Sequence, residues 1–335
     1  MAHGVGITPA PPQAGVIREL LLERMAEDSR AQFAATIAPG YLLPESAGHA
    51  GTYPVDTGYY GLDLSRDPDA LNPVSLSATN YLDEELSFST RPYAIGRYQV
   101  GRYDLPRRKG TNLLSTSGID AERLIVSKFA AKASAIYYQQ VIERLNAAGS
   151  YAAGHSYDPG NLSVSTFNLA AALEPVIGLF ADAQVDLAST DLVLVAAPAV
   201  MAAMRNLDQI RAWAGRAGGP SPNTNYETTD AVSAWLQDYL GARSVTAIVD
   251  RPRYRNAGGT SVNGLTAASA VFAVASGGTD RSFLKTLTVA GDEELFSLRP
   301  EEVPAFDGTR YYCDMYHEVN LVDTTAAVQW TGLLT

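Results

Sequence analysis

Cysteine is almost absent from this 335-residue sequence, and the single Cys313 excludes a disulfide framework and a multi-cysteine metal site. No apolar run approaches the ~20 residues that cross a bilayer, and no charged-then-apolar signal segment opens the chain. Basic residues are outnumbered, with 25 Lys and Arg against 36 Asp and Glu, so the formal net charge is −11. This balance argues against a dedicated nucleic-acid binder, which needs a basic face. We expect a soluble protein of a reducing cytoplasm.

Sequence motifs of catalysis and cofactor binding are also missing. The pair His317-Glu318 begins like a zinc-protease motif, but position 321 is Leu, so the second ligand is absent. The GVG run at residues 4–6 lacks the preceding strand and the third glycine of a dinucleotide-binding turn. Neither a Gly-x-Ser-x-Gly elbow nor a phosphate-binding Gly-Lys-Ser/Thr occurs. We expect His317 to be a half-buried strand residue and Cys313 a small hydrophobe, and we predict no catalytic, cofactor-binding or metal-binding residue and no enzyme.

The N-terminal part contains one amphipathic pattern followed by an irregular stretch. Residues 16–37 place apolar side chains on one stripe, and Pro39-Gly40 ends the predicted helix. Residues 40–73 are rich in Pro, Gly and Tyr and are expected to be loop-like. Two interpretations stay open: an arm that packs on another subunit, or a helix folded onto its own core. The arm would bury Ile17, Leu21, Met25 and Phe33 against a neighbour.

A β-rich segment and a long helix follow. Residues 74–104 alternate Ser or Thr with aromatic and apolar residues, which is typical of strands, and the acidic run at 83–85 is expected at a turn. A two-stranded ribbon is marginal alone in water, so it needs a surface of its own chain or of a neighbour. From Ala121 to Ala148 there is no Pro or Gly, with Asp120 as a plausible N-cap and Gly149 as the stop. About 28 residues predict a helix of about 42 Å.

The second half of the chain first alternates strands with helices and then becomes β-rich. Alternation of this kind predicts a small sheet covered by helices. Residues 310–322 alternate apolar and polar side chains with period two, which predicts a half-buried antiparallel strand. The predicted helices are 165–182, 198–213 and 229–240, and the predicted strands are 191–197, 244–250, 270–276, 283–298, 310–322 and 326–334.

This order of elements resembles the major capsid protein of tailed bacteriophages, whose Hong Kong 97-type fold is shared with encapsulin shells. The run RPYAIGRYQVGRYDLP at 91–106, leading into the helical segment at 118–151, resembles an extended loop that enters a spine helix. The run DLVLVAAPAVMAAMRNLDQIRAW at 191–213 looks like the strand-then-helix unit of an axial domain. The ending YHEVNLVDTTAAVQWTGLL at 316–334 resembles the strand that returns to that domain.

The resemblance implies an α+β fold with an N-arm, an extended β loop, a long spine helix, a peripheral domain and an axial domain. The arm and the loop use nearly all residues before position 119, so a separate scaffolding protein is implied. The implied boundaries are 1–50 for the arm, 66–104 for the extended loop, 51–65 with 105–161 and 251–323 for the peripheral domain, 119–148 for its spine helix, and 162–250 with 324–335 for the axial domain.

The function implied by the resemblance is that of a major capsid protein. It would assemble into hexamers and pentamers of an icosahedral phage head that encloses double-stranded DNA, in the cytoplasm of a host bacterium and then in the virion. The implied partners are further copies of itself, a scaffolding protein, a portal, an optional decoration protein and packaged DNA contacted non-specifically, with no membrane. The alternatives are an encapsulin-like nanocompartment shell and, from another class, a soluble cytoplasmic α/β enzyme.

The basic residues, of which 21 are Arg and 4 are Lys, suggest how subunits would meet. The guanidinium fork suits carboxylates, so in an acidic chain we favour pairing with acids of neighbours over contacts with phosphate. Some members of the fold join a loop lysine to a neighbour's asparagine, but residues 66–104 contain no Lys, and Lys109 is the nearest. A non-covalent shell is therefore expected. The predicted inter-subunit contacts are Ile17, Leu21, Met25, Phe33, Asp83, Glu84, Glu85, Arg107, Arg108, Arg251, Arg253, Arg255, Glu293 and Glu294.

Overall fold

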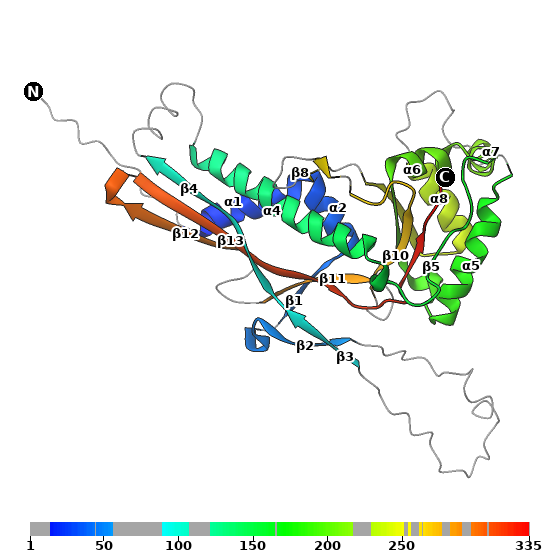
Figure 1. The fold of residues 1–335 in the computed structure, drawn as a ribbon, viewed down its shortest axis with the longest axis horizontal. Helices are drawn as coiled ribbons and strands as arrows, with labels where there is room; N and C mark the ends of the chain where they lie inside the picture. The colour runs from blue at the N-terminus through cyan, green and yellow to red at the C-terminus, as the bar shows by residue number, and fades with distance from the viewer. Residues whose placement is uncertain are drawn as a thin grey trace, which may run out of the picture.

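The chain folds into an elongated half built on one long helix and a compact half built on a second sheet (Figure 1). This arrangement is seen in a computed structural model. It describes residues 14–43, 45–55, 89–106, 121–164, 166–216, 229–250, 254–255, 261–262, 264–276, 282–289, 296–306 and 308–334.

The long helix α4, Ala121–Asn146, forms the axis of the elongated half, as the sequence predicted. It contains no residue that breaks a helix, and its apolar side chains recur every three or four positions. A short 3-10 turn, η3 (Ala148–Ser150), follows it. The buried apolar residues of α4 are Ile125, Val126, Phe129, Ala130, Ala133, Tyr137, Tyr138, Val141, Ile142 and Leu145.

The N-terminal residues form two helices, α1 (Ala14–Glu27) and α2 (Ser29–Ile37), where the sequence predicted one. Asp28 separates them because its carboxylate accepts a hydrogen bond from the Arg30 backbone N–H (2.9 Å) and thereby caps α2. Both helices pack against α4.

The packing of α1 and α2 corrects the arm interpretation. Leu21, Met25 and Phe33 are only 1%, 6% and 5% exposed in the single chain, and the Phe33 ring lies 5.3 Å from that of Tyr138 on α4. These side chains are inside the subunit's own core, so the expectation that they contact a neighbour is wrong. Ile17 lies in α1, and its side chain is outside what the structure describes.

A five-stranded sheet lies along α4 and is centred on the long strand β13 (Gly308–Leu321). β13 pairs antiparallel with β4, β12 and β11, while β1 runs parallel to β11. The register with β4 shifts between Cys313 and Asp314, leaving Val100 as the extra residue of a bulge. The outer strands are β1 (Gly40–Leu43), β4 (Gly96–Pro106), β11 (Leu284–Val289) and β12 (Phe296–Val303).

Residues 40–55 are not the loop that the sequence predicted. They form β1, the short 3-10 helix η1 (Glu45–Ala47) and β2 (Ala50–Val55), which pairs antiparallel with β3 (Ser89–Ala94). Of the two surfaces considered for the predicted ribbon, β4 uses that of its own chain, because it is paired along β13. The acidic turn expected at 83–85 lies outside the described residues.

The compact half holds the second sheet, in the order β5-β14-β10-β6-β7. β6 and β7 are parallel, so the chain crosses between them through three helices, as parallel pairing requires. The expected helix 198–213 is two helices that meet near Asn206, and the first has Pro198 at its start. The sheet strands are β5 (Ser156–Tyr157), β6 (Asp191–Ala196), β7 (Ser244–Val249), β10 (Ala270–Ser276) and β14 (Ala327–Trp330).

The helices of the compact half cover a sheet that is nearly all apolar. Helix α5 begins after Asn168, whose side chain accepts from the Ala171 N–H, and not at residue 165 as expected. The helices of the compact half are α5 (Leu169–Asp182), α6 (Pro198–Arg205), α7 (Asp208–Arg216) and α8 (Thr229–Leu240). The remaining short elements of the chain are η4 (Leu187–Ser189), β8 (Tyr254–Arg255), β9 (Ser261–Val262) and η5 (Pro304–Phe306).

Candidate functional site

In the described part of the chain, no group of three or more His, Cys, Asp or Glu is placed to hold a metal ion. None of the described helices is both long and apolar enough to cross a membrane.

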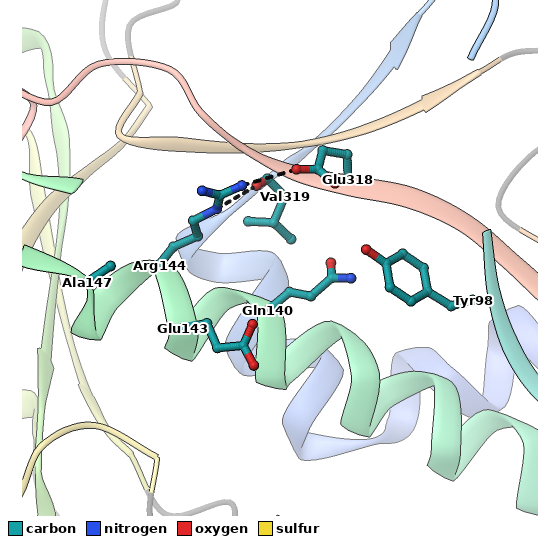
Figure 2. Close-up of a pocket in the computed structure, with 7 residues that line it drawn as sticks. All are labelled: Tyr98, Gln140, Glu143, Arg144, Ala147, Glu318 and Val319. Atoms are coloured by element: carbon teal, nitrogen blue, oxygen red, sulfur yellow. Dashed lines mark hydrogen bonds and ion pairs between the residues drawn. The ribbon is translucent and has the colours of Figure 1, made fainter. Parts of the chain in front are cut away.

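A pocket of about 310 Å³ lies on the flank of α4, where the helix faces β4 and β13 (Figure 2). Arg144 closes one side, because its guanidinium donates to Glu318 Oε1 (3.1 Å) and to the Val319 carbonyl (3.2 Å). The Gln140 amide points toward Tyr98, and neither amide atom has a hydrogen-bond partner among the described residues. The full lining is Tyr98, Gln140, Glu143, Arg144, Ala147, Glu318 and Val319.

The electrostatics of this pocket suit a structural clamp better than catalysis. Burial raises the pKa of Glu318, and the ion pair with Arg144 opposes that shift. Burial also raises the pKa of Tyr98, as do the nearby charges of Glu318 and Glu143. A carboxylate committed to an arginine and a neutral phenol provide neither a free base nor a nucleophile. The pair joins the C-terminal turn of α4 to β13.

His317 and Cys313 lie deeper in the same half, on the face of β13 that meets α4. His317 is 1% exposed, not half-buried as expected, because its ring packs between those of Tyr98 (5.1 Å) and Tyr137 (5.8 Å). Burial lowers the pKa of His317 to about 3, and neither ring nitrogen has a hydrogen-bond partner among the described residues. Burial, aided by the Asp314 charge, raises the pKa of Cys313 to about 12, so the expectation of a small buried hydrophobe is confirmed.

A buried carboxylate joins the two halves of the molecule. Asp250, which follows β7, accepts hydrogen bonds from the Tyr138 hydroxyl of α4 and from the Leu265 N–H. Burial raises the pKa of Asp250, whereas these two hydrogen bonds lower it. Asn146 at the end of α4 donates to the Gly264 carbonyl (2.9 Å). A Cβ on Gly264 would lie 2.0 Å from both Asp250 Oδ2 and the Tyr138 hydroxyl oxygen, so only glycine fits.

The sequence analysis missed this junction. It placed Asp250 at the end of the predicted strand 244–250 and assigned Gly264 to no predicted helix or strand. The available signal was the Asn-Gly dipeptide at 263–264, which marks a turn, after an acid that ends an apolar strand. Nothing local to either position indicates that Tyr138 lies against both.

The opposite face of the β4–β13–β12 region carries exposed arginines. Arg97 and Arg299 both donate to Asp314 Oδ2 (2.6 and 3.2 Å), whose side chain is only 5% exposed. Arg102 and Arg310 both pair with Asp104 (3.1 and 2.7 Å) and hold the pKa of that carboxyl well below its usual range. We call this surface the arginine face, and it consists of Arg97, Asp104, Arg102, Arg299, Arg310 and Asp314.

Alternation along β13 separates this face from the core. Tyr311, Cys313 and Met315 are buried, and a Cβ on the neighbouring Gly101 of β4 would lie 3.1 Å from Phe129 of α4. The side chains on the other side are more open, with Arg97, Arg102 and Arg299 at 51%, 55% and 59% exposed. The arginine face is therefore directed away from the spine helix.

Most of the predicted inter-subunit contacts cannot be located. Arg255 is in β8, and its side chain is not described. The structure brings none of the predicted Arg–acid sets together among the residues that it describes. Asp83, Glu84, Glu85, Arg107, Arg108, Arg251, Arg253, Glu293 and Glu294 lie outside the described residues, so their contacts stay predictions.

Comparison with known proteins finds likeness in structure and none in sequence. No protein-family model and no curated protein matches the chain. A phage-related protein from Bordetella bronchiseptica RB50 matches at a TM-score of 0.61 and 11% identity, over 93% of this chain and 95% of its own. The mature capsid subunit of bacteriophage PhiM1 matches at 0.51 and 7% identity, over 88% and 86%. The capsid subunit of cyanophage P-SCSP1u matches at 0.50 and 9% identity, over 100% and 93%. The chain has the α+β, Hong Kong 97-type fold of phage capsid proteins.

Proposed function

We propose that this chain is a shell-forming structural protein, the major capsid protein of a tailed-phage type head. Copies of it would form the hexamers and pentamers of an icosahedral shell around double-stranded DNA. The observation that carries the proposal is the match to the phage-related protein over 93% of this chain, joined by matches to two phage capsid subunits over most of their length. The proposed location is the virion, after assembly in the cytoplasm of a host bacterium.

The shape of the subunit fits this role. The elongated half holds its spine between two helices and a sheet, while β2 and β3 extend from the body as an antiparallel pair (Figure 1). Asp250 and Gly264 tie this half to the compact one. The proposed partners are further copies of the chain, a scaffolding protein, a portal, a decoration protein and non-specifically held DNA. The boundaries of the arm, loop, peripheral and axial regions stay predictions.

The test of the proposal is the assembly state of the full chain. The chain is expressed alone and beside a scaffolding protein, purified, and examined by negative-stain microscopy and sedimentation. We expect rings or closed shells. Discrete small particles at every concentration, with and without scaffold, would contradict the proposal. Nuclease-protected DNA inside the shells is the expected content, and a packaged enzyme would indicate a nanocompartment instead.

The same particles test the expectation of a non-covalent shell. An isopeptide bond needs an amine nucleophile, which the always-protonated guanidinium cannot replace. Residues 66–104 contain no Lys, and Lys128 on α4 lies over the Tyr103 ring at 5.7 Å. Boiled particles are expected to run as one band near 35.7 kDa on a denaturing gel. A ladder of covalent oligomers would contradict this and would point first to Lys109.

A further inference from the structure

The pocket on the flank of α4 offers more acceptor atoms than its own chain uses. Two carboxylates and one guanidinium line it, so the lining carries one excess negative charge. Glu143 accepts from the Gln139 amide with Oε1 (2.8 Å), and Glu318 accepts from Arg144 with Oε1 (3.1 Å). The second oxygen of each carboxylate remains an acceptor for another donor. The pocket therefore suits a ligand that brings positive charge and hydrogen-bond donors.

The Gln140 amide is a second, independent observation at this pocket. Both of its polar atoms are buried, and neither has a hydrogen-bond partner among the described residues. Figure 2 shows the amide directed toward Tyr98, and it lies near enough to lower the pKa of that phenol without reaching hydrogen-bond geometry. A buried polar group without a partner carries a desolvation cost. A ligand that donates a hydrogen bond to the Gln140 carbonyl oxygen would offset part of this cost.

We propose that this pocket binds a primary ammonium group carried on a short aliphatic stem. Gln140 and Glu143 are three residues apart on α4 and are neighbours on its surface, so one ammonium can donate to both side chains. Glu318 of β13 lies across the pocket and adds a second negative charge (Figure 2). Acceptors that come from different elements suit the rotatable donors of an ammonium better than the planar guanidinium fork. The aliphatic stem would lie against Ala147 and Val319.

The charges of the two carboxylates act on the same small space. Burial raises the pKa of Tyr98, and the charges of Glu318 and Glu143 raise it further. Burial also raises the pKa of Glu318, against the ion pair with Arg144. An ammonium between these groups would stabilise both carboxylates in their charged form. At about 310 Å³ the pocket lies at the lower end of ligand-binding cavities, so it suits an amine of a few carbon atoms.

The inference goes beyond the shell-forming role and does not depend on it, because all the groups named belong to one chain. Free subunits are therefore titrated with n-butylammonium and, as a neutral molecule of nearly the same size, with n-butanol. Isothermal titration calorimetry measures both affinities. We expect the amine to bind about tenfold more tightly than the alcohol, and its binding to weaken as salt screens the carboxylates. Equal affinities, or no binding of the amine, would overturn the inference.

A matched pair of variants separates the pocket from general charge effects. Glu143→Gln removes one carboxylate and keeps the size of the side chain, so we expect the affinity for n-butylammonium to fall about fivefold. Glu23→Gln makes the same change on the exposed side of α1 and is expected to leave the affinity unchanged. Both side chains are exposed, so the fold is expected to be kept, and thermal unfolding of each free variant checks this. The same affinity in Glu143→Gln as in the wild type would contradict the assignment.

A primary ammonium can reach this pocket from a free amine or from a lysine side chain of a second copy. Titration of assembled particles distinguishes these two sources. Equal affinity in particles and in free subunits assigns the pocket to a free amine. Affinity that is present in free subunits and lost in particles assigns the pocket to a lysine of another copy, and the amine would then also compete with assembly.

Replacement of Gln140 distinguishes a ligand site from a purely structural amide. Gln140→Leu removes the buried amide that has no partner and keeps an apolar side chain of similar size. We expect the melting temperature of the free subunit to rise by about 1–3 °C, while the affinity for n-butylammonium falls about threefold. A lower melting temperature together with an unchanged affinity would show that the amide supports the fold, and would overturn its place in the site.

Discussion

The two sheets of this molecule differ in whether their buried polar groups have partners: Gln329 of β14 is hydrogen-bonded, whereas several polar groups around β13 are not. In the compact half, Val271, Phe272, Ala273 and Val274 of β10 are each 0% exposed, and Trp330 of β14 packs on Phe272 with ring centroids 4.8 Å apart. In the elongated half, β13 buries Asp314, His317 and Asn320 among its apolar residues. The described side chains with buried, unpartnered polar atoms all belong to the elongated half: Ser134, Gln140, Ser282, His317 and Asn320.

This difference shows which half of the fold carries the energetic cost of buried polar groups without partners. Each buried polar group without a partner costs about 1–3 kcal/mol. The compact half has mainly apolar strands, and its buried Gln329 is hydrogen-bonded. The elongated half keeps several costly groups and an exposed arginine face. It is the half in which contacts with other molecules have most to stabilise.

The largest effect is expected from the N-terminal helices. Leu21→Ala should lower the free energy of unfolding of the free subunit by about 2–5 kcal/mol, because it empties a fully packed site beside α4. Leu22 is the matched control: it is adjacent, chemically identical and 38% exposed, so Leu22→Ala should cost about 0.5 kcal/mol. Chemical denaturation of both variants measures the difference. Equal costs would restore the arm interpretation, in which Leu21 acts only between subunits.

The next effect is expected at the junction of the two halves. Gly264→Ala forces a methyl group onto the Asp250 carboxylate and the Tyr138 hydroxyl, each 2.0 Å from the new atom. Overpacking and a broken buried hydrogen bond together should cost about 3 kcal/mol. The variant is also expected to be cleaved faster by a protease between the halves, which limited proteolysis followed by mass spectrometry detects. An unchanged melting temperature would show that the junction can relax without loss.

Helices were far better predicted from the sequence than sheet pairing was. Helix α8 begins and ends where its apolar period and turn residues indicated, and α4 begins at the predicted Ala121 but ends at Asn146, before the predicted Ala148. The break at Asp28 was missed because an acid on the exposed side of one continuous helix cannot be distinguished in the sequence from an acid that caps a second helix. β1 was read as loop because its four residues become a strand only through pairing with β11, far along the chain.

The same limit applies to the candidate site. Arg97 and Asp314 are separated by 217 positions, and Arg310 and Asp104 by 206, so no local pattern connects them. The arginines were visible as a compositional bias, whereas their shared carboxylates were not. His317 was placed correctly on a strand, but its full burial depends on Tyr98 and Tyr137 from two other elements.

A smaller and pH-dependent effect is expected from His317. Its pKa is about 3 in the fold against about 6.5 in the unfolded chain, so the unfolded state takes up a proton first as the pH falls. Stability is therefore full above pH 6.5 and is lost by ~1.4 kcal/mol per unit between about 6.5 and 3, or about 2 kcal/mol by pH 5.

Among the described residues, no neighbour of His317 opposes this loss of stability. Burial raises the pKa of Tyr137 to about 12 and also raises that of Tyr98, so both phenols stay neutral, and Glu318 is engaged by Arg144. His317→Phe is expected to remove this part of the pH dependence in denaturation curves from pH 7.5 to 4.5. Replacement of the exposed His49 by Gln is the control for the loss of a histidine outside this core. Parallel slopes for the wild type and His317→Phe would contradict the assignment.

The smallest effect is expected from a glycine of the compact half and has the opposite sign to that at Gly264. Gly178 lies inside α5, on its exposed side, and a Cβ there would meet nothing within 4 Å. Alanine loses less backbone entropy on folding than glycine does, so Gly178→Ala should stabilise the free subunit by about 0.5–1 kcal/mol. Denaturation of free subunits measures this gain, and the same variant is then examined in assembled particles. If the gain is present in free subunits but assembly is weakened, the exposed side of α5 faces another copy at close range. If the free subunit itself is destabilised, an added methyl group is no better tolerated at Gly178 than at Gly264. The expected contrast between these two positions would then be wrong.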